Sequence, residues 1–197
     1  MNSIELKDAT PEQAKKAAKM IDGNHKIHGI VGLPTGETFL LFESLRESGF
    51  EEEPPIVGYS LRAIPLSLLD EEKFEWDDVP KVILSIFPTD VGSEGRQFHK
   101  VVMNHIEKTY PESEPETTFC IELEEIHMAE YRSKGLGSYM LQMALAQCHN
   151  TCLECELVIT HIFGEVEPAD EDRLEDVNRF YRRHGFRETY GEIYRMI

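Results

Sequence analysis

The most informative segment of the sequence is Tyr131-Arg132-Ser133-Lys134-Gly135-Leu136-Gly137-Ser138, because it joins a predicted strand to a predicted helix. Two glycines separated by one residue let the backbone come close to a ligand, and the first N–H groups of a helix have no partner inside it. A pyrophosphate suits that place, where the helix dipole is positive and where Arg132 or Lys134 can neutralise more of its charge. The same residues also fit a tight turn followed by a helix N-cap, so the segment alone leaves both interpretations open.

Regular patterns flank this segment on both sides. A predicted strand, Phe119–His127, precedes it, with clean alternation of apolar and polar residues at its start. A helix from Ser138 to about Cys148 follows, and then a strand over Glu156–Thr160 and a helix from Arg173 to His184. Two short strands around Gly191 are predicted to close the chain between Phe186 and Ile197.

The N-terminal part begins with a short predicted strand, Ile4–Lys7, and a helix. Thr10-Pro11-Glu12-Gln13 has the pattern of a helix start, with a hydroxyl N-cap, a proline at the first helical position and a glutamine that can complete a capping box. The helix is predicted to end near Gly23, and its apolar face comprises Ala14, Ala17, Ala18 and Ile21.

The next segment contains several residues that interrupt regular structure: Gly29, Gly32, Pro34 and Gly36. We therefore expect a loop or a short irregular helix there. Two strands, Thr38–Glu43 and Ile56–Ile64, are expected to form an antiparallel hairpin beyond it. Strands and helices alternate after this strand-rich start, which predicts a mixed α/β sheet with helices on both faces.

Residues 65–117 are the hardest to assign. They contain an acidic run from Asp70 to Asp78, a strand-like stretch Val82–Phe87 and a predicted helix from Arg96 to Tyr110, and a polar, proline-bearing linker follows. The segment is too short to bury a sufficient core alone. We therefore expect it to be part of a single domain that spans residues 1–197.

Composition narrows the classes of partner. The chain has 197 residues, of which 41% are hydrophobic, and its 20 Lys and Arg against 37 Asp and Glu give a net charge of −17. Such a surface repels nucleic acid phosphates and anionic lipid headgroups, so neither nucleic acid nor a membrane is an expected partner. The acidity fits a cationic partner such as a polyamine, an aminoglycoside or a Lys/Arg-rich peptide, and it equally fits a plain contribution to solubility.

The sequence also predicts a cytoplasmic protein. No stretch approaches the ~18–20 apolar residues of a spanning helix, and the start lacks the basic-then-apolar layout of a signal peptide. The four cysteines fit reduced thiols in that compartment. Zinc binding by Cys148, Cys152 and Cys155 beside His149 is the alternative, but their spacing matches no strong zinc pattern, so no metal is expected.

Two motifs carry a resemblance to a known family. Arg132–Gly137 resembles the R/Q-x-x-G-x-G/A acetyl-coenzyme A loop of the GNAT superfamily of acetyltransferases, and Arg179–Phe186 is similar to the family's F-Y-x-x-x-G-F segment. The opening residues Ile4–Glu12 and the stretch Ile56–Tyr59 resemble the family's first strand and helix and its third strand, so the resemblance spans nearly the whole chain.

The sequence departs from the family at three points. Residues 65–117 are longer than the family's usual connection between its third and fourth strands. Leu174 stands where the family often has asparagine, and Asn178 could offer an amide one turn closer to the helix tyrosine. Ala129 stands where the family often has proline.

The resemblance implies a GNAT-like fold with a central, mostly antiparallel sheet that is splayed between its fourth and fifth strands. It places residues 65–117 as an insertion on the acceptor side. It also implies acetyl-coenzyme A as co-substrate, with its pantetheine arm in the gap between the splayed strands. The residues that would bind it are the main-chain groups of Ile126, His127 and Met128, the loop residues Arg132, Ser133, Lys134, Gly135, Leu136, Gly137 and Ser138, and the amide of Asn178.

The implied activity is N-acetyl transfer to a primary amine by direct attack in a ternary complex, in a monomer or homodimer. Tyr181 stands at the position where the family has its general acid. The alternative is that Tyr181 is a half-buried residue that packs between a helix and the sheet. Glu122 and Glu124 project from one strand face and are candidate bases, or part of a solvated acidic face, and His127 is a further candidate. The alternative function is a non-catalytic acyl-coenzyme A-binding or acidic interaction protein on the same fold.

Overall fold

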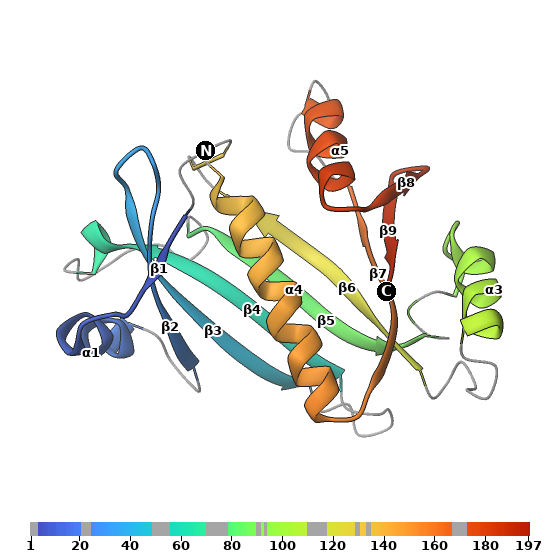
Figure 1. The fold of residues 1–197 in the computed structure, drawn as a ribbon, viewed down its shortest axis with the longest axis horizontal. Coiled ribbons are helices and arrows are strands. Elements are labelled where there is room, and N and C mark those ends of the chain that lie inside the picture. The colour runs from blue at the N-terminus through green and yellow to red at the C-terminus, as the bar shows by residue number, and fades with distance from the viewer. Residues whose placement is uncertain are drawn as a thin grey trace. The chain divides into compact units, whose positions relative to one another are not determined.

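The structure is a computed structural model that describes residues 4–20, 25–48, 56–69, 79–89, 92, 94–109, 118–128, 131–132, 135–166 and 173–197. Within these residues nine strands form one mixed sheet in the order β1-β2-β3-β4-β5-β6-β7-β9-β8, accompanied by four α-helices (Figure 1). The predicted mixed α/β class is therefore confirmed.

The elements have the following bounds. The strands are β1 (Leu6–Lys7), β2 (His25–Gly32), β3 (Thr38–Ser48), β4 (Ile56–Pro65), β5 (Lys81–Pro88), β6 (Thr118–His127), β7 (Val158–Glu165), β8 (Arg187–Thr189) and β9 (Glu192–Met196). The helices are α1 (Pro11–Met20), α3 (His99–Thr109), α4 (Leu136–Glu154) and α5 (Leu174–Arg183), with a short 3₁₀ turn η1 (Leu66–Leu68).

The chain divides into two compact units, each of which is described by itself. The first comprises Met1–Arg46, Gly58–Ile83 and Glu125–Leu145, and the second comprises Glu47–Val57, Leu84–Glu124 and Ala146–Ile197. Residues 65–117 contribute to both units, so they do not form a compact unit of their own. The single-domain organisation remains a prediction.

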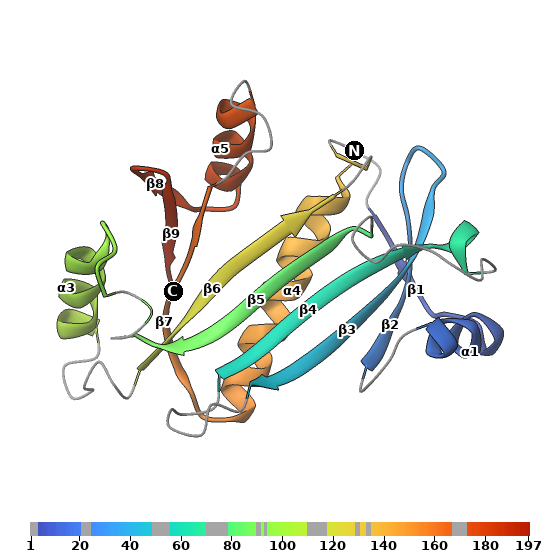
Figure 2. The ribbon, with the colours of Figure 1, turned by 180° about the vertical axis from the view of Figure 1, so that it is seen from behind.

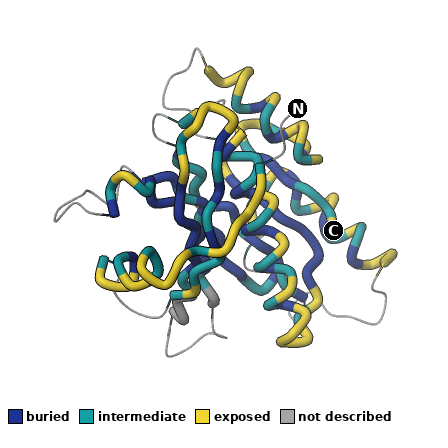
Figure 3. The backbone as a smooth tube through the Cα atoms, turned by 60° about the vertical axis from the view of Figure 1, so that its left-hand side comes forward, coloured by how far each residue is buried: buried dark blue, intermediate teal, exposed yellow. Residues whose placement is uncertain are grey.

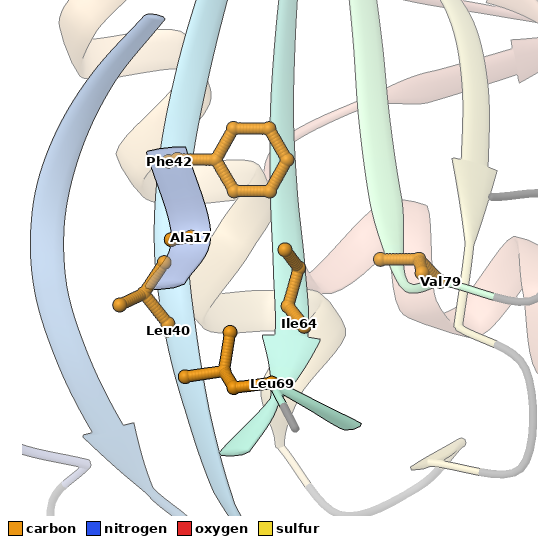
Figure 4. Close-up of a cluster of buried hydrophobic side chains, with 6 residues drawn as sticks. All are labelled: Ala17, Leu40, Phe42, Ile64, Leu69 and Val79. Atoms are coloured by element: carbon orange, nitrogen blue, oxygen red, sulfur yellow. The ribbon is translucent and has the colours of Figure 1, made fainter. Parts of the chain in front are cut away.

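Helix α1 begins as its sequence predicts. The Thr10 backbone N–H donates to Gln13 Oε1 at 2.9 Å and the Gln13 N–H donates to Thr10 Oγ1 at 3.3 Å, which is the reciprocal pair of a capping box. Ala17 is fully buried and lies in a cluster with Leu40 and Phe42 of β3, joined by Ile64, Leu69 and Val79 (Figure 4). The cluster holds α1 against one face of the first unit's strands.

The prediction of a loop at Gly29 to Gly36 is wrong for its first half, because His25–Gly32 forms strand β2. Gly29 has φ +145°, and a Cβ there would clash with the carbonyl oxygen of Lys7 in β1. The register of β2 on β3 also shifts between Ile27 and Gly29, which makes His28 the extra residue of a β-bulge. The glycine therefore permits a bulge and a close strand approach instead of ending the strand.

The core of the second unit forms where α3 packs on β6, β7 and β9. Phe98 is 1% exposed, and its ring lies 5.6 Å from that of Phe163 and 5.3 Å from that of Tyr194. Val102, Ile106 and Cys120 complete the cluster. The sequence predicts a helix here over Arg96 to Tyr110, and the structure places most of that range in α3.

Strands β6 and β7 are parallel, with Thr118–Leu123 registered on Val158–Gly164. Strand β9 pairs antiparallel with both β7 and β8, and the turn between β8 and β9 contains Gly191 at φ +84°. The closing pair of strands is therefore as predicted. Strand β7 is longer than its prediction, because the apolar run continues through Phe163.

Helix α4 also exceeds its predicted length, since it begins at Leu136 and ends at Glu154. Its first half belongs to the first unit, and this half lies in front of that unit's strands in Figure 1 and behind them in the reverse view of Figure 2. The tube in Figure 3 shows burial concentrated along strands and exposure along helix flanks and turns. Within the described ranges, none of the helices is long and apolar enough to cross a membrane.

Candidate functional site

The segment after β6 is anchored in the first unit by aromatic packing. The Tyr131 N–H donates to the carbonyl of Met128 at 2.9 Å, and Met128 is buried. The Tyr131 ring meets Phe39 of β3 edge-on, with ring centroids 4.7 Å apart. These contacts hold Tyr131 against the first unit's strands.

Gly135 is the last residue before α4 and has φ +89°, a conformation that favours glycine. Its carbonyl accepts the helical hydrogen bond from the Tyr139 N–H at 3.1 Å, so the N–H groups of Leu136, Gly137 and Ser138 precede that first bond. Leu136 is fully buried and holds the helix start in place. Arg132 is exposed, whereas Ser133 and Lys134 lie outside the described residues.

The last residues of β6 belong to the same unit. Ile126 and His127 are half-buried, and the His127 Nε2 atom is buried with no hydrogen-bond partner among the described residues. Lys81 of β5 pairs with Glu125 at 3.1 Å. Ile126 and His127 are the last two residues of β6, and Met128 follows them. Their part in binding a cofactor stays a prediction.

The parallel pairing of β6 with β7 stops before β6 does. The last registered pair is Leu123 with Gly164, and β6 continues to His127. A Cβ at Gly164 would lie 2.7 Å from the Leu123 carbonyl oxygen, so glycine permits the close approach at this point.

Glu122 and Glu124 alternate with buried residues on β6, as predicted. Ile121 and Leu123 are buried, while Glu122 is half-buried and Glu124 is exposed. Glu124 accepts a hydrogen bond from the Ser85 hydroxyl of β5. Burial raises the pKa of Glu122, Arg96 opposes that shift, and the charges of Glu124 and Glu165 add to it, so that the net pKa lies above the usual range.

Arg96 is a site residue that the sequence patterns did not indicate. It precedes α3 and pairs with Glu122 at 3.5 Å, with Glu192 at 3.6 Å and with Glu165. Its partners come from β6, β7 and β9, far apart in the chain, so no local sequence pattern could have identified the group.

Helix α5 carries the predicted acid. Tyr181 is 9% exposed and lies between Phe180 and Phe186, with ring centroids 5.3 and 5.6 Å away. Burial raises the pKa of Tyr181 to about 12, so its hydroxyl is protonated at neutral pH.

Asn178 lies one turn before Tyr181 on α5. It is 6% exposed, and its Oδ1 atom has no hydrogen-bond partner within the described chain. An unsatisfied buried amide oxygen costs about 1–3 kcal/mol, so a ligand donor or an ordered water is expected at it. Leu174, where the family often has asparagine, is exposed.

The predicted residues therefore fall into two groups. The loop from Arg132 to Ser138 and Ile126–Met128 belong to the first unit, whereas Glu122, Glu124, Asn178 and Tyr181 belong to the second.

A second cluster, around Glu43 in the first unit, also has no counterpart among the sequence predictions. Glu43 Oε2 accepts hydrogen bonds from His28 Nε2 at 2.6 Å and from the Tyr59 hydroxyl at 2.9 Å, and Lys26 Nζ lies 3.5 Å from Oε1. Burial alone would raise the pKa of Glu43, but the hydrogen bonds and the charges of His28 and Lys26 outweigh it and lower the pKa. The bulge at His28 directs the imidazole toward this carboxylate, and neither feature has a local sequence signal.

The cysteines do not gather with other ligands. Cys148 and Cys152 are buried one helical turn apart on α4 and Cys155 is exposed. Over the described part of the chain, no three His, Cys, Asp or Glu side chains come together in a group that could hold a metal ion. A hollow of about 270 Å³ is lined by Thr10, Glu12, Gln13, Lys16, Leu66 and Leu69, and it contains none of the predicted site residues.

No protein-family model matches the sequence, and no curated protein is significantly similar to it.

Proposed function

We propose that this protein is an N-acetyltransferase that transfers the acetyl group of acetyl-coenzyme A to a primary amine on a cationic small molecule, a polyamine or a protein. The observation that carries the proposal is Gly135, a positive-φ residue between an anchored strand end and the N-terminus of α4, within a segment that resembles an acetyl-coenzyme A loop. Helix N-termini favour anions such as pyrophosphate.

The end of β6 supports the same proposal. Because β6 continues beyond its last registered pair with β7, the stretch Glu124–His127 has main-chain groups that the β7 register does not use. Extended main-chain donors and acceptors suit the amide groups of a pantetheine arm. Ile126, His127 and Met128 would provide them.

Acetyl transfer requires deprotonation of the amine, stabilisation of the oxyanion and protonation of the thiolate. The acceptor ammonium loses a proton to a carboxylate, for which Glu122 is the better placed candidate because its pKa is raised. The neutral amine nitrogen then forms a bond with the thioester carbonyl carbon, and a backbone N–H stabilises the oxyanion. The C–S bond breaks, and the Tyr181 hydroxyl gives its proton to the departing thiolate. The nitrogen loses its second proton to solvent as the amide forms, and the Tyr181 phenolate takes a proton back from solvent.

Calorimetry with acetyl-coenzyme A tests the binding step. Gly137→Val places a side chain at the helix start without altering a positive-φ residue, and Arg132→Gln removes an exposed charge. We expect each to weaken binding, by more than the ~1.4 kcal/mol that makes a factor of ten for the first, and severalfold for the second. Arg187→Gln, an exposed arginine on β8, is the matched control and should bind as the wild type does.

Release of the coenzyme A thiol against a panel of spermidine, an aminoglycoside and a Lys-rich peptide tests turnover. Thiol release that depends on the amine supports the transferase. Binding without release would instead favour the non-catalytic acyl-coenzyme A-binding protein, and unchanged affinity in folded Gly137→Val would contradict the loop assignment.

A further inference from the structure

Arg96 is a single cation shared by three carboxylates of the second unit. Its Nη1 pairs with Glu165 and lies 3.6 Å from Glu192 Oε1, and its Nη2 lies 3.5 Å from Glu122 Oε1. One positive charge against three negative charges leaves the group with a net charge of −2 at neutral pH. The group is therefore short of positive charge.

The arginine is held in a defined place. Its side chain is only 25% exposed, and the guanidinium carbon lies over the Phe163 ring at 5.2 Å. The backbone N–H of Gln97 donates to Glu192 Oε2 at 3.0 Å, which fixes that carboxylate beside it. Partial burial and the aromatic face reduce solvent screening, so the charge acts more strongly than in an exposed pair.

Glu122 is the carboxylate of this group that is a candidate general base, and the charge of Arg96 acts on its ionisation. Among the described residues, the charged groups that face Glu122 are Arg96 before α3, Glu124 on β6 and Glu165 at the end of β7. Glu192 of β9 acts through Arg96. Burial and the two like charges favour the protonated carboxyl, while Arg96 favours the carboxylate. A general base must be ionised when the amine arrives and must still bind a proton readily. Arg96 favours the first condition, and burial with the two like charges favours the second.

We propose that Arg96 is the positioning residue that holds the Glu122 carboxylate in place and keeps it ionised as the base for the attacking amine. This inference rests on the proposed function. In the step concerned, the carboxylate takes one proton from the ammonium, which leaves a neutral amine and a neutral carboxylic acid. The proton passes to solvent after acetyl transfer and regenerates the carboxylate.

The first arm of the test needs no activity. In protein labelled with ¹³C at the glutamate carboxyls, the Glu122 resonance is assigned by its loss in Glu122→Gln and titrated with pH. We expect Arg96→Gln to raise the Glu122 titration midpoint by about one pH unit, because the favourable cation is lost. Glu165→Gln removes a negative charge instead and should lower the Glu122 midpoint. Because Glu165 is half exposed, this variant is expected to fold, and it keeps the test decisive if Arg96→Gln does not fold.

The second arm uses acetyl-coenzyme A and the best amine of the panel. The acidic limb of the kcat/KM profile should move in the same direction and by the same amount as the midpoint in each variant. Arg96→Lys, which keeps the charge, should restore most of the wild-type profile, and Arg187→Gln should leave it unchanged.

Each outcome decides the inference. A Glu122 midpoint that stays in place in Arg96→Gln or Glu165→Gln overturns it. The Glu122 midpoint could also move while the acidic limb of the kcat/KM profile stays in place. That result overturns the assignment of Glu122 as the base but leaves the proposed transferase activity standing. If the wild type neither binds acetyl-coenzyme A nor releases thiol, the proposed function fails and the inference fails with it, which the calorimetry shows separately.

Discussion

Glu43 and Glu122 are both partly or fully buried carboxylates on strands, yet their surroundings are opposite. Glu43 is 9% exposed and faces His28, Tyr59 and Lys26, so that every neighbour favours its ionised form. Glu122 shares one arginine with two other carboxylates, and its pKa is raised where that of Glu43 is lowered.

The contrast extends to uncharged groups. The Glu43 cluster satisfies its buried polar atoms, whereas other buried atoms of the described chain have no hydrogen-bond partner: His127 Nε2 in the first unit, and His161 Nε2 and Asn178 Oδ1 in the second. Satisfied polar groups stabilise a fold, and unsatisfied ones cost free energy unless a ligand or water completes them. We infer that the Glu43 cluster holds strands together, while the unsatisfied atoms elsewhere are places where a ligand or a water molecule can bind.

The largest expected effect is on stability at Glu43. Glu43→Ala leaves His28 and Tyr59 buried without their acceptor, and we expect it to lower the free energy of unfolding by about 3–5 kcal/mol in urea denaturation at pH 7. Glu165→Ala is the matched control from the second cluster and should cost no more than ~1 kcal/mol, because it is half exposed and one of three acids on one cation. Equal losses would remove the distinction between the clusters.

Acid titration sharpens the same contrast. Because the pKa of Glu43 is lowered on folding, its contribution is present above the unfolded carboxyl pKa of about 4.5 and is lost as pH falls through the folded pKa. The pKa of Glu122 is raised on folding, so this residue stabilises the fold below the unfolded carboxyl pKa. That stabilisation is lost as pH rises through the folded pKa of Glu122. Glu43→Gln and Glu122→Gln should therefore change the pH dependence of stability in opposite directions.

The next effect concerns His161, which is fully buried beside Phe98 and Phe163. Burial, with a smaller effect of His105, lowers its pKa to about 4 from the usual value of 6.5. The contribution of His161 to the free energy of unfolding is therefore fully present above pH ~6.5. It falls by about 3 kcal/mol as the pH drops toward 4, because the histidine takes up a proton more readily in the unfolded chain.

His161→Leu should flatten the unfolding free energy between pH 6.5 and 4.5, measured by urea denaturation at several pH values. His149→Gln, a half-buried histidine on α4, serves as the control and should leave the slope unchanged. A slope that persists in His161→Leu would assign the acid sensitivity to another group.

Tyr181→Phe tests whether the second unit serves catalysis. If the hydroxyl protonates the thiolate, kcat should fall on the order of 10²-fold with cofactor affinity nearly unchanged, because only the proton donor and not the ring is lost. Thermal unfolding should change little, since no described side chain accepts a hydrogen bond from this hydroxyl. Full activity with every amine would make Tyr181 a packing residue.

The smallest expected effect is at Asn178. Asn178→Leu removes an unsatisfied buried amide, so without ligand we expect a gain of about 1 kcal/mol in unfolding free energy. The same variant should bind acetyl-coenzyme A less tightly in calorimetry. Asn104→Leu, at an exposed position of α3, is the control, and a loss of stability in Asn178→Leu alone would show that the amide already has a partner.

The sequence by itself determined the elements whose signals are local. The capping box at Thr10, the alternation in β6 and the glycine at the start of α4 each depend on residues a few positions apart, so propensity and periodicity sufficed. The glycine spacing likewise made Gly135 a candidate site residue, whereas Asn178 and Tyr181 became candidates only through the resemblance of their segment to a known family.

Only the tertiary structure decided which distant residues share a site. Gly29 has the local pattern of a strand breaker. The bulge before it depends on the pairing of β2 with β3, and its close approach to Lys7 depends on β1, and a local pattern shows neither. Arg96 meets acids from three strands, and Glu43 meets donors from two others. The pKa of a carboxyl depends on burial and on charges a few ångströms away in space, whatever their separation in the chain, so the opposite states of Glu43 and Glu122 had no sequence signal.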